Sequence, residues 1–234
     1  MRILIIVPAY NEAESIARTL KELRETVPEC DAIVVNDGSS DDTSGICRDL
    51  GFKVLDLQEN LGLAAAMQTG MLYAEQMDYD AAIQIDADGQ HDPRFIKDMA
   101  AKMEETGADI VIGSRFTEGK RPGSLRSWGN GLLSRVTKLT TGQWISDTTS
   151  GMRLYRRGII KLMAEGINLG PEPDTVAYLI RCGAKVEEVP IKVRERTAGK
   201  SYLSPGRSVF YMIHMCMNIC FIQWVRKRSD IKCR

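Results

Sequence analysis

Ile3-Leu4-Ile5-Ile6-Val7-Pro8-Ala9-Tyr10-Asn11-Glu12 lies near the start of the chain and decides the fold. The five apolar residues 3–7 predict a β-strand, and an apolar side chain at every position is typical of a strand buried on both faces of a parallel sheet. Pro8 ends this strand. Asn11, with Glu14 three residues later, predicts the N-cap of a helix. The stretch therefore predicts the first strand and helix of an α/β fold.

The same alternation continues along the chain. Further strands are predicted at 32–35, 53–57, 81–85, 109–112, 152–155 and 185–193. Further helices are predicted at 42–50, 62–77, 127–140 and 173–182, and another has Pro93 at its first position. Strands and helices that alternate at this spacing predict a Rossmann-like α/β fold, in which helices flank a mostly parallel sheet.

Polar motifs follow four of the predicted strands. They are Tyr10-Asn11-Glu12, Asn36-Asp37-Gly38, Asp86-Ala87-Asp88 and Gly113-Ser114-Arg115. Doubly wound sheets bind their ligands at the carboxyl ends of the strands. We therefore expect the four motifs to converge on one rim of the sheet and to form a ligand site there.

The composition excludes several classes of protein. The 234 residues include 31 basic and 31 acidic side chains, so no strong field exists to attract nucleic acid. Six cysteines without a Cys-x-x-Cys pair, and only two histidines, argue against a zinc site and for reduced thiols. No signal peptide is recognisable at the start. Neither a dinucleotide-binding glycine motif nor a P-loop follows the first strand, which argues against a dinucleotide oxidoreductase and a P-loop NTPase.

Asp86 and Asp88 are two residues apart in an extended segment, so their carboxylates project to the same side. Two such carboxylates repel each other unless a cation joins them. Mg²⁺ or Mn²⁺ suits this arrangement, because such ions are held by one or two carboxylates together with substrate phosphates. The alternative is a solvated turn, since Asp-Gly pairs form turns. The position of the string Asp86-Ala87-Asp88-Gly89-Gln90-His91 after a buried strand favours the metal.

Asp37 ends the second predicted strand, where a carboxylate can accept hydrogen bonds from a ribose or a base. The alternative for Asp37 is an Asx turn before Gly38. Tyr10, in the first loop, would border a base or else pack in the core. These two loops therefore predict a nucleoside site beside the metal site.

A family resemblance emerges when the motifs are taken in order. They are Val7-Pro8-Ala9-Tyr10-Asn11-Glu12, Asn36-Asp37-Gly38-Ser39-Ser40-Asp41, Asn60-Leu61-Gly62-Leu63, Asp86-Ala87-Asp88-Gly89-Gln90-His91, Gly113-Ser114-Arg115-Phe116, Asp147-Thr148-Thr149-Ser150-Gly151-Met152-Arg153, Glu188-Val189-Pro190 and Arg196-Thr197-Ala198-Gly199-Lys200-Ser201. As an ordered set over residues 2–204, they resemble the inverting family 2 glycosyltransferases of GT-A fold. The likeness is greatest to polyprenyl-phosphate and dolichyl-phosphate sugar transferases.

The resemblance implies roles for the residues at matching positions. The nucleoside of a UDP- or GDP-sugar would be bound by Pro8, Tyr10, Glu12 and Asp37. The diphosphate and its Mg²⁺ or Mn²⁺ would lie near Asp86 and Asp88, with Asp88 as the direct ligand and Gln90 assisting. The catalytic residues would be Arg115, Arg126 and Arg196, which neutralise phosphate charge, and Asp147, which lies beside the acceptor.

The acceptor side leaves alternatives open. A polyprenyl phosphate is already anionic and needs little help from a base, whereas a hydroxyl acceptor requires one. Asp147 is the first choice for that base, followed by Glu172 or Asp174. Where many relatives have a lysine after the Gly-x-Ser motif, this chain has Tyr202, and Lys200 stands two residues earlier.

The C-terminal segment differs from the rest of the chain. Residues 208–225 carry no formal charge and precede Arg226-Lys227-Arg228. The run is borderline for a membrane span. We expect an amphipathic helix over 205–228 that contacts a membrane surface or a membrane-protein partner. The alternative is a core or dimer helix, and a homo-oligomer remains open.

The domain boundaries follow from these assignments. Residues 1–204 would form the transferase domain, with a nucleotide-binding half at 1–115 and an acceptor half at 116–204. Residues 205–234 would form the C-terminal helix. The expected location is peripheral, at the cytoplasmic face of a membrane.

The leading expectation is metal-dependent transfer of a hexose from a UDP- or GDP-sugar to a polyprenyl phosphate at a membrane surface, with inversion at the anomeric carbon. Three other functions are weighed against it. The first is sugar transfer to a hydroxyl of a cell-wall or surface glycan, which shares the donor half of the site. The second is a non-catalytic nucleotide-binding module, which the persistence of the metal, arginine and acceptor motifs disfavours. The third is a nucleotidyltransferase, which the absence of a glycine- and lysine-rich loop near the first strand disfavours.

Overall fold

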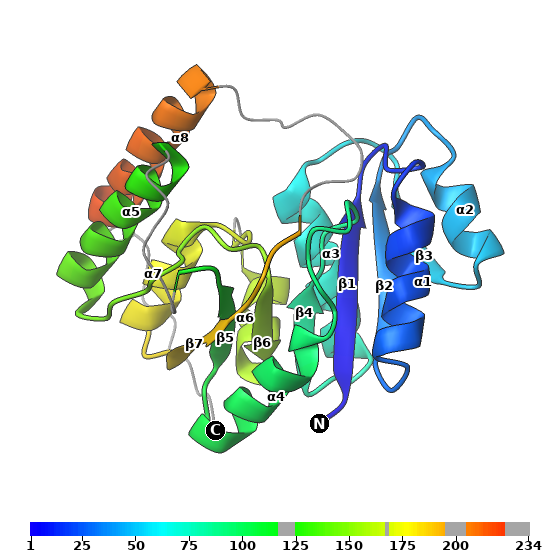
Figure 1. Ribbon diagram of the computed structural model, residues 1–234, viewed down its shortest axis with the longest axis horizontal. Helices are drawn as coiled ribbons and strands as arrows, with labels where there is room; N and C mark the ends of the chain where they lie inside the picture. Colours follow the sequence, from blue (N-terminus) through cyan, green and yellow to red (C-terminus); the bar gives the residue numbers. More distant parts are fainter. Residues whose placement is uncertain (117–124, 167–168, 195–204, 223–234) are drawn as a thin grey trace.

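The computed structural model describes residues 1–116, 125–166, 169–194 and 205–222 (Figure 1). Within these residues, seven strands form one sheet in the order β3-β2-β1-β4-β6-β5-β7. The strands are β1 (Ile3–Ala9), β2 (Asp31–Asp37), β3 (Lys53–Leu57), β4 (Ala81–Gln84), β5 (Ile110–Ser114), β6 (Arg153–Arg156) and β7 (Val186–Pro190). All pairings are parallel except those of β6, which runs antiparallel to β4 and β5. The predicted mostly parallel sheet is confirmed.

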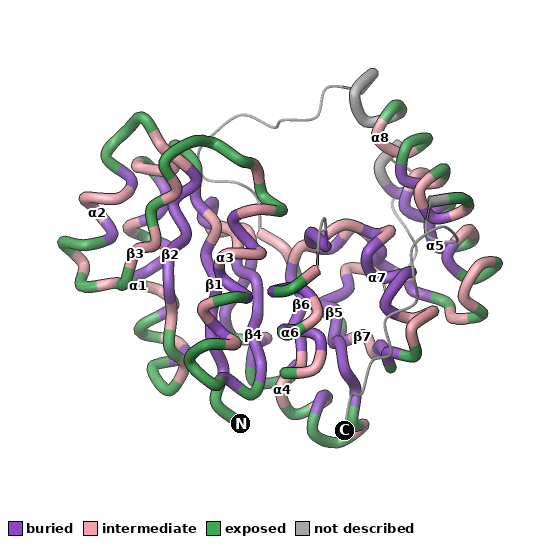
Figure 2. Tube along the Cα trace, turned by 180° about the vertical axis from the view of Figure 1, so that it is seen from behind, coloured by how far each residue is buried: buried purple, intermediate pink, exposed green. Residues whose placement is uncertain are grey.

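Helices cover both faces of the sheet (Figures 1 and 2). They are α1 (Ile16–Thr26), α2 (Thr43–Asp49), α3 (Leu63–Gln76), α4 (Phe95–Thr106), α5 (Leu125–Thr141), α6 (Arg157–Glu165), α7 (Pro173–Arg181) and α8 (Pro205–Met217), which continues as the π-helix η1 (Asn218–Ile222). Strand β1 shows how one apolar run serves two layers. Leu4 and Ile6 pack toward α3 and α6, while Ile5 and Val7 pack toward α1 and α4. Successive strand residues point to opposite faces, so burial on both sides requires an apolar residue at every position.

The predicted N-cap at Asn11 is wrong. Helix α1 starts at Ile16, and Asn11 has a φ of 54°, outside the helical region. The physical reason is a contact with the loop after β2. The Asn11 N–H donates to Ser39 Oγ (2.9 Å), and Asn11 Oδ1 accepts the Ser40 N–H (2.8 Å). Asn11 therefore joins two loops of the rim and does not cap the helix.

Helix α4 also starts later than predicted. It begins at Phe95, two residues after Pro93. The side chain of Asp92 accepts the Arg94 N–H at 3.0 Å, and this turn occupies the positions that we predicted as the first helical residues. The difference moves a helix boundary but not the order of the elements.

Helices α5, α7 and α8 pack together beside the sheet (Figure 1). Their common core contains Leu133, Ala177, Met215 and Ile219. Gly129 of α5 faces the Met212 side chain of α8: a Cβ at position 129 would lie 2.2 Å from the Met212 methyl, which would have to move. The predicted C-terminal helix is observed as far as Ile222, and residues 223–228 lie outside the described part. No helix within the described residues is long and apolar enough to cross a bilayer.

Candidate active site

The four polar motifs lie at one edge of the sheet. Strands β1, β2, β4 and β5 all run in the same direction, because β6 reverses the direction between β4 and β5. Their carboxyl ends therefore share one rim, as expected. A cavity of about 300 Å³ opens there, a volume within the range of small-ligand sites. Its polar lining includes Gln84, Asp86, Gln90, His91, Arg115, Arg153, Glu172 and Tyr211.

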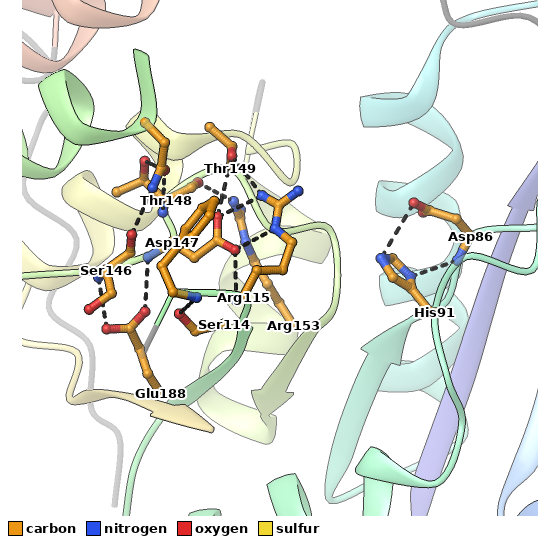
Figure 3. A network of polar contacts seen from close by, with 12 residues as sticks. Asp86, His91, Ser114, Arg115, Ser146, Asp147, Thr148, Thr149, Arg153 and Glu188 are labelled. Carbon is orange, nitrogen blue, oxygen red and sulfur yellow. Dashed lines mark hydrogen bonds and ion pairs between the residues drawn. The ribbon is translucent and has the colours of Figure 1, made fainter. Parts of the chain in front are cut away.

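Asp86 follows the C-terminal end of β4, and its side chain is 36% exposed. Its Oδ1 accepts a hydrogen bond from Gln84 Nε2 at 2.8 Å. The buried His91 ring stands beside it (Figure 3): His91 Nδ1 accepts the Asp86 N–H at 3.2 Å, and His91 Nε2 lies 3.6 Å from Asp86 Oδ2. Since Nδ1 accepts, the ring proton belongs on Nε2, which faces the carboxylate. Asp86 is thus a partly exposed carboxylate at the cavity.

Asp88 and Gln90 follow in a tight turn. Asp88 is buried, and its Oδ1 accepts the Gln90 N–H at 3.0 Å, while Gly89 between them has a φ of +74° that favours glycine. Gln90 Nε2 donates to the Arg194 carbonyl at 3.3 Å, so this turn is tied to the segment after β7. The cavity lining includes Asp86 and Gln90 but not Asp88.

The residues expected to bind the nucleoside lie in the loops after β1 and β2. Asp37 is buried, and its two carboxylate oxygens accept the N–H groups of Leu61 and Gly62, both at 2.8 Å. It therefore anchors the loop that precedes α3, in place of the Asx turn that we considered. Gly38 allows the loop that precedes α3 to pack closely against the end of β2, because a Cβ at position 38 would lie 2.6 Å from the backbone of Glu59.

The first loop holds the other three of these residues. Tyr10 is 36% exposed, so it does not pack in the core, which was the alternative considered for it. Glu12 and Pro8 are half-buried, and the Glu12 N–H donates to Thr43 Oγ1 at 2.9 Å. The cavity lining includes none of Pro8, Tyr10, Glu12 or Asp37. Of these four residues, Tyr10 is the most exposed and Asp37 is buried.

Arg115 and Asp147 form the most enclosed ion pair of the site (Figure 3). Asp147 is fully buried, and Arg115 is 19% exposed at the cavity. Arg115 donates from Nε to Asp147 Oδ2 at 2.6 Å and from Nη2 to Asp147 Oδ1 at 2.7 Å. The Arg115 N–H also donates to Oδ2, and Thr149 Oγ1 lies 3.3 Å from Oδ1. The carboxylate is therefore surrounded by donors, and it fixes the arginine in one orientation.

Two further residues hold the loop that carries Asp147. The sequence placed Glu188 in one of the family motifs without a role, and it offered no signal for Asn130. Glu188 on β7 accepts the N–H groups of Ser146 and Asp147 at 2.8 and 3.0 Å. Asn130 on α5 accepts the Thr148 N–H at 3.0 Å and donates to the Ser146 carbonyl at 2.7 Å. A glutamate in the strand predicted at 185–193 was the available clue to the first contact.

Gly151 brings the two parts of the site together. A Cβ at this position would lie 3.2 Å from His91 and 3.3 Å from Asp86 Oδ2. The loop that starts at Asp147 therefore ends against the Asp86 carboxylate. Of the other predicted arginines, Arg126 lies in the first turn of α5 with its side chain outside the described part, and Arg196 lies outside the described residues.

Glu172 and Tyr211 close another side of the cavity. The Tyr211 hydroxyl on α8 donates to Glu172 Oε2 at the N-terminus of α7. Burial raises the pKa of Tyr211, and the Glu172 carboxylate adds to the rise, so the hydroxyl keeps its proton. Asp174 Oδ2 lies 3.5 Å from Asn218 Nδ2. The C-terminal helix thus supplies a wall of the site, which the sequence did not predict.

The carboxylates at the end of β4 fit a divalent cation. Within the described part of the chain, no three His, Cys, Asp or Glu side chains converge as a complete ligand set. Two carboxylates with hard oxygen atoms match the way in which Mg²⁺ and Mn²⁺ share protein ligands with substrate phosphates. The residues present therefore suit an ion that binds together with a diphosphate.

The chain is similar in sequence to a known family of transferases. The sequence pattern of glycosyl transferase family 2 matches residues 4–163. An undecaprenyl-phosphate mannosyltransferase of Micrococcus luteus is 34% identical over 221 residues, which cover 88% of this chain and 89% of that protein. A UDP-N-acetylglucosamine–dolichyl-phosphate N-acetylglucosaminyltransferase of Methanococcus voltae is 30% identical over 91% of this chain and 95% of that protein.

A solved structure shows the same architecture. Glucosyl-3-phosphoglycerate synthase from Mycobacterium tuberculosis, in complex with Mn²⁺, uridine diphosphate and glucosyl-3-phosphoglycerate, is similar with a TM-score of 0.69 at 17% identity. The similarity covers 97% of this chain and 81% of that one. The expected GT-A fold is confirmed.

Proposed function

The chain belongs to glycosyl transferase family 2, and from this premise we propose that it transfers a hexose from a UDP- or GDP-sugar to a polyprenyl phosphate, with inversion at the anomeric carbon. The relatives from Micrococcus luteus and Methanococcus voltae are named for undecaprenyl phosphate and dolichyl phosphate. The observation that carries the proposal is the Arg115 cation, which a fully buried carboxylate holds at the same cavity as Asp86.

The proposal divides the chain by task. Residues 1–115 bind the nucleotide, with Pro8, Tyr10, Glu12 and Asp37 around the nucleoside. Residues 116–204 bind the acceptor, and residues 205–234 contact the membrane. Asp37 can serve two partners, because each carboxylate oxygen has a second lone pair beside the one that accepts from the 61–62 backbone.

Asp86 and Asp88, with Gln90 beside them, would hold Mg²⁺ or Mn²⁺ together with the donor diphosphate. The ion supplies positive charge where the leaving nucleoside diphosphate becomes more negative. His91 contributes through Asp86, because its Nε2 proton faces the Asp86 carboxylate and its ring limits how that side chain turns. Asp86 is therefore the carboxylate of this pair that reaches the donor.

Arg115, the last residue of the nucleotide-binding half, would face the acceptor half and bind the acceptor phosphate. Asp147 holds the guanidinium in place and has no exposed surface on which to take up a proton. Asp147 is thus a positioning residue in this proposal, and the earlier hypothesis that it acts as a base is not needed. An anionic phosphate acceptor requires no base. Arg126 and Arg196 complete the proposed set of cations around the phosphates.

The test is a comparison of acceptors. The enzyme is incubated with radiolabelled UDP-glucose or GDP-mannose, Mg²⁺ or Mn²⁺, and one of polyprenyl phosphate, polyprenol or a soluble saccharide. We expect a labelled lipid from polyprenyl phosphate and none from polyprenol. Label in the saccharide alone would overturn the proposal and favour transfer to a hydroxyl.

The outer faces of α5 and α8 support the membrane part of the proposal. On α5, Trp128 is 74% exposed and Leu139 is 86% exposed; on α8, Phe210 is 74% exposed and Ile213 is 59% exposed. These side chains lie on adjacent helices that pack against each other (Figure 1). Apolar side chains at such positions can enter the boundary between lipid headgroups and acyl chains. The described cysteines are free thiols, which suits the cytoplasmic face.

Vesicle binding tests this part. The double variant Phe210→Ser/Ile213→Ser should bind vesicles of phosphatidylglycerol and phosphatidylcholine about tenfold or more weakly, because burial of each apolar side chain is worth about 1.5–3 kcal/mol. The control is Leu72→Ser, which changes an exposed leucine on α3. Equal binding by both variants and the wild type would contradict membrane contact through this face.

A further inference from the structure

Two buried polar atoms at the cavity have no hydrogen-bond partner. Among the described residues, they are Gln84 Oε1 and Arg153 Nε, and the two residues are 2% and 1% exposed. Both residues line the cavity. A buried donor or acceptor without a partner costs about 1–3 kcal/mol, so proteins rarely retain one without a reason. The roles assigned above use neither residue.

The two residues are neighbours on the sheet. Strands β4 and β6 pair antiparallel, with Ala82 opposite Tyr155 and Ile83 opposite Leu154. The next pair in this register is Gln84 with Arg153. Opposite residues of an antiparallel pair project to the same face, with Cβ atoms roughly 5 Å apart. The unpaired acceptor and the unpaired donor therefore belong to adjacent side chains.

The remaining atoms of both side chains are fixed. Gln84 Nε2 donates to Asp86 Oδ1 at 2.8 Å, which sets the amide orientation because a carboxylate only accepts. Arg153 Nη2 donates to the Thr148 carbonyl at 2.8 Å, and its Nη1 donates to the Glu172 carbonyl at 3.3 Å. The pair therefore holds one unpaired acceptor and one unpaired donor in two fixed, adjacent side chains that line the cavity beside the Asp86 carboxylate.

We propose that Gln84 and Arg153 form hydrogen bonds with one hydroxyl of the transferred hexose and so help to determine which sugar is used. The hydroxyl accepts from Arg153 Nε and donates to Gln84 Oε1. A phosphate oxygen of the donor diphosphate does not fit, because it has no proton to give to the Gln84 oxygen. This inference rests on the proposed function, since it assigns what the donor sugar meets beside Asp86.

The experiment measures donor binding without an acceptor. UDP, GDP, UDP-glucose and GDP-mannose are titrated in the presence of Mn²⁺, followed by the monodeoxy analogues of whichever sugar nucleotide binds. In the wild type, removal of one particular hydroxyl should weaken binding ten- to a hundredfold. Gln84→Leu should bind the parent sugar and that deoxy analogue equally. The ratio between them is the readout, because it is insensitive to a uniform effect of the substitution on Asp86.

A matched control separates this effect from the loss of any amide. Gln68 donates to the carbonyls of Ala164 and Gly166 at 3.1 and 2.9 Å, away from the cavity lining. Gln68→Leu should keep the wild-type ratio. Thermal unfolding of each variant confirms that it is folded.

The outcomes are distinct. Wild-type binding of every monodeoxy analogue within twofold of the parent overturns the inference without any variant. An unchanged ratio in folded Gln84→Leu also overturns it and indicates that the pair holds a water molecule. Failure of the wild type to bind any of these sugar nucleotides would overturn the proposed function, and the inference with it.

Discussion

The two sides of the cavity use charge in opposite ways. On one side, Asp147 is fully buried and its oxygens accept hydrogen bonds from Arg115, so this network is complete without a ligand. On the other side, Asp86 is 36% exposed, and its side-chain partners within the described part of the chain are Gln84 and His91. Figure 3 shows the dense network around Asp147 and, across from it, Asp86 with His91 beside it.

This difference indicates that the Asp147 side of the cavity has a structural role, whereas the Asp86 side is available to contact a ligand. A buried carboxylate that is fully hydrogen-bonded orients the cation beside it, and removal of the carboxylate leaves that cation uncompensated. A partly exposed carboxylate retains oxygen lone pairs for a ligand and contributes little to folding. We therefore expect substitutions at Asp147 to reduce stability and activity together, and substitutions at Asp86 to reduce activity alone.

The largest expected effect is that of Asp147→Asn. The asparagine keeps the shape but leaves Arg115 without its counter-charge, so we expect a loss of about 3 kcal/mol in the free energy of unfolding and a loss of activity. Chemical denaturation and lipid-product assays measure the two. Addition of Arg115→Gln should restore part of the stability and none of the activity. Wild-type stability in Asp147→Asn would show that the network is not a scaffold.

Asp86→Asn is the converse test. We expect activity to fall by about 10²–10³-fold, since the substitution removes a proposed ligand of the ion that would offset the developing negative charge. The free energy of unfolding should change by less than about 1 kcal/mol, because the side chain is partly exposed. A large loss of stability with little loss of activity would reverse the proposed contrast between the two sides.

Asp92 connects the segment before α4 to the segment after β7, and its effect on stability should depend on pH. Hydrogen bonds from Arg94 lower the pKa of Asp92 to about 2, and Arg194, from the segment after β7, contributes further. Its carboxylate therefore stabilises the fold above the ordinary pKa of 3.8, and this stabilisation is lost as the pH falls toward 2.

We expect Asp92→Asn to cost about 1–2 kcal/mol at pH 7, with allowance for screening of the exposed Arg94. The difference from the wild type should shrink between about pH 4 and pH 2. Urea unfolding at several pH values measures both. A difference that stays constant across this range would show that the charge of Asp92 is not the cause.

The smallest expected effect is that of Tyr211→Phe. It removes the hydrogen bond from α8 to Glu172 and should cost about 1 kcal/mol, with a modest rise in the donor KM. Tyr73→Phe is the control, because its hydroxyl contacts Lys53 at the exposed surface. If the two variants unfold alike and bind donor alike, α8 is not a functional wall of the cavity.

Local pattern accounted for much of the fold. The apolar runs predicted the strands, and the motifs at their ends predicted the shared rim, because both follow from periodicity and from the direction of parallel strands. Asn11 shows where local reasoning failed. The sequence places a capping partner three residues after Asn11. In the folded sheet, however, Ser39 and Ser40 lie next to Asn11 and form the hydrogen bonds instead.

Gln84 and Arg153 show what stayed hidden in the site. A glutamine within the predicted strand 81–85 and an arginine within 152–155 were visible polar exceptions. Their significance required the antiparallel pairing of β4 with β6, which joins segments about 70 residues apart. The wall formed by Tyr211 likewise depends on how α8 packs against α5 and α7.

The sequence by itself determined that the chain forms an α/β sheet, that its polar motifs gather at one edge, and that the motifs match family 2 glycosyltransferases. These properties follow from side-chain periodicity and residue type. The tertiary structure alone decided that Asp147 holds Arg115 and that Asp86 is left partly exposed at the cavity. The reason is that burial and hydrogen-bond partners arise from long-range packing, which local sequence does not encode.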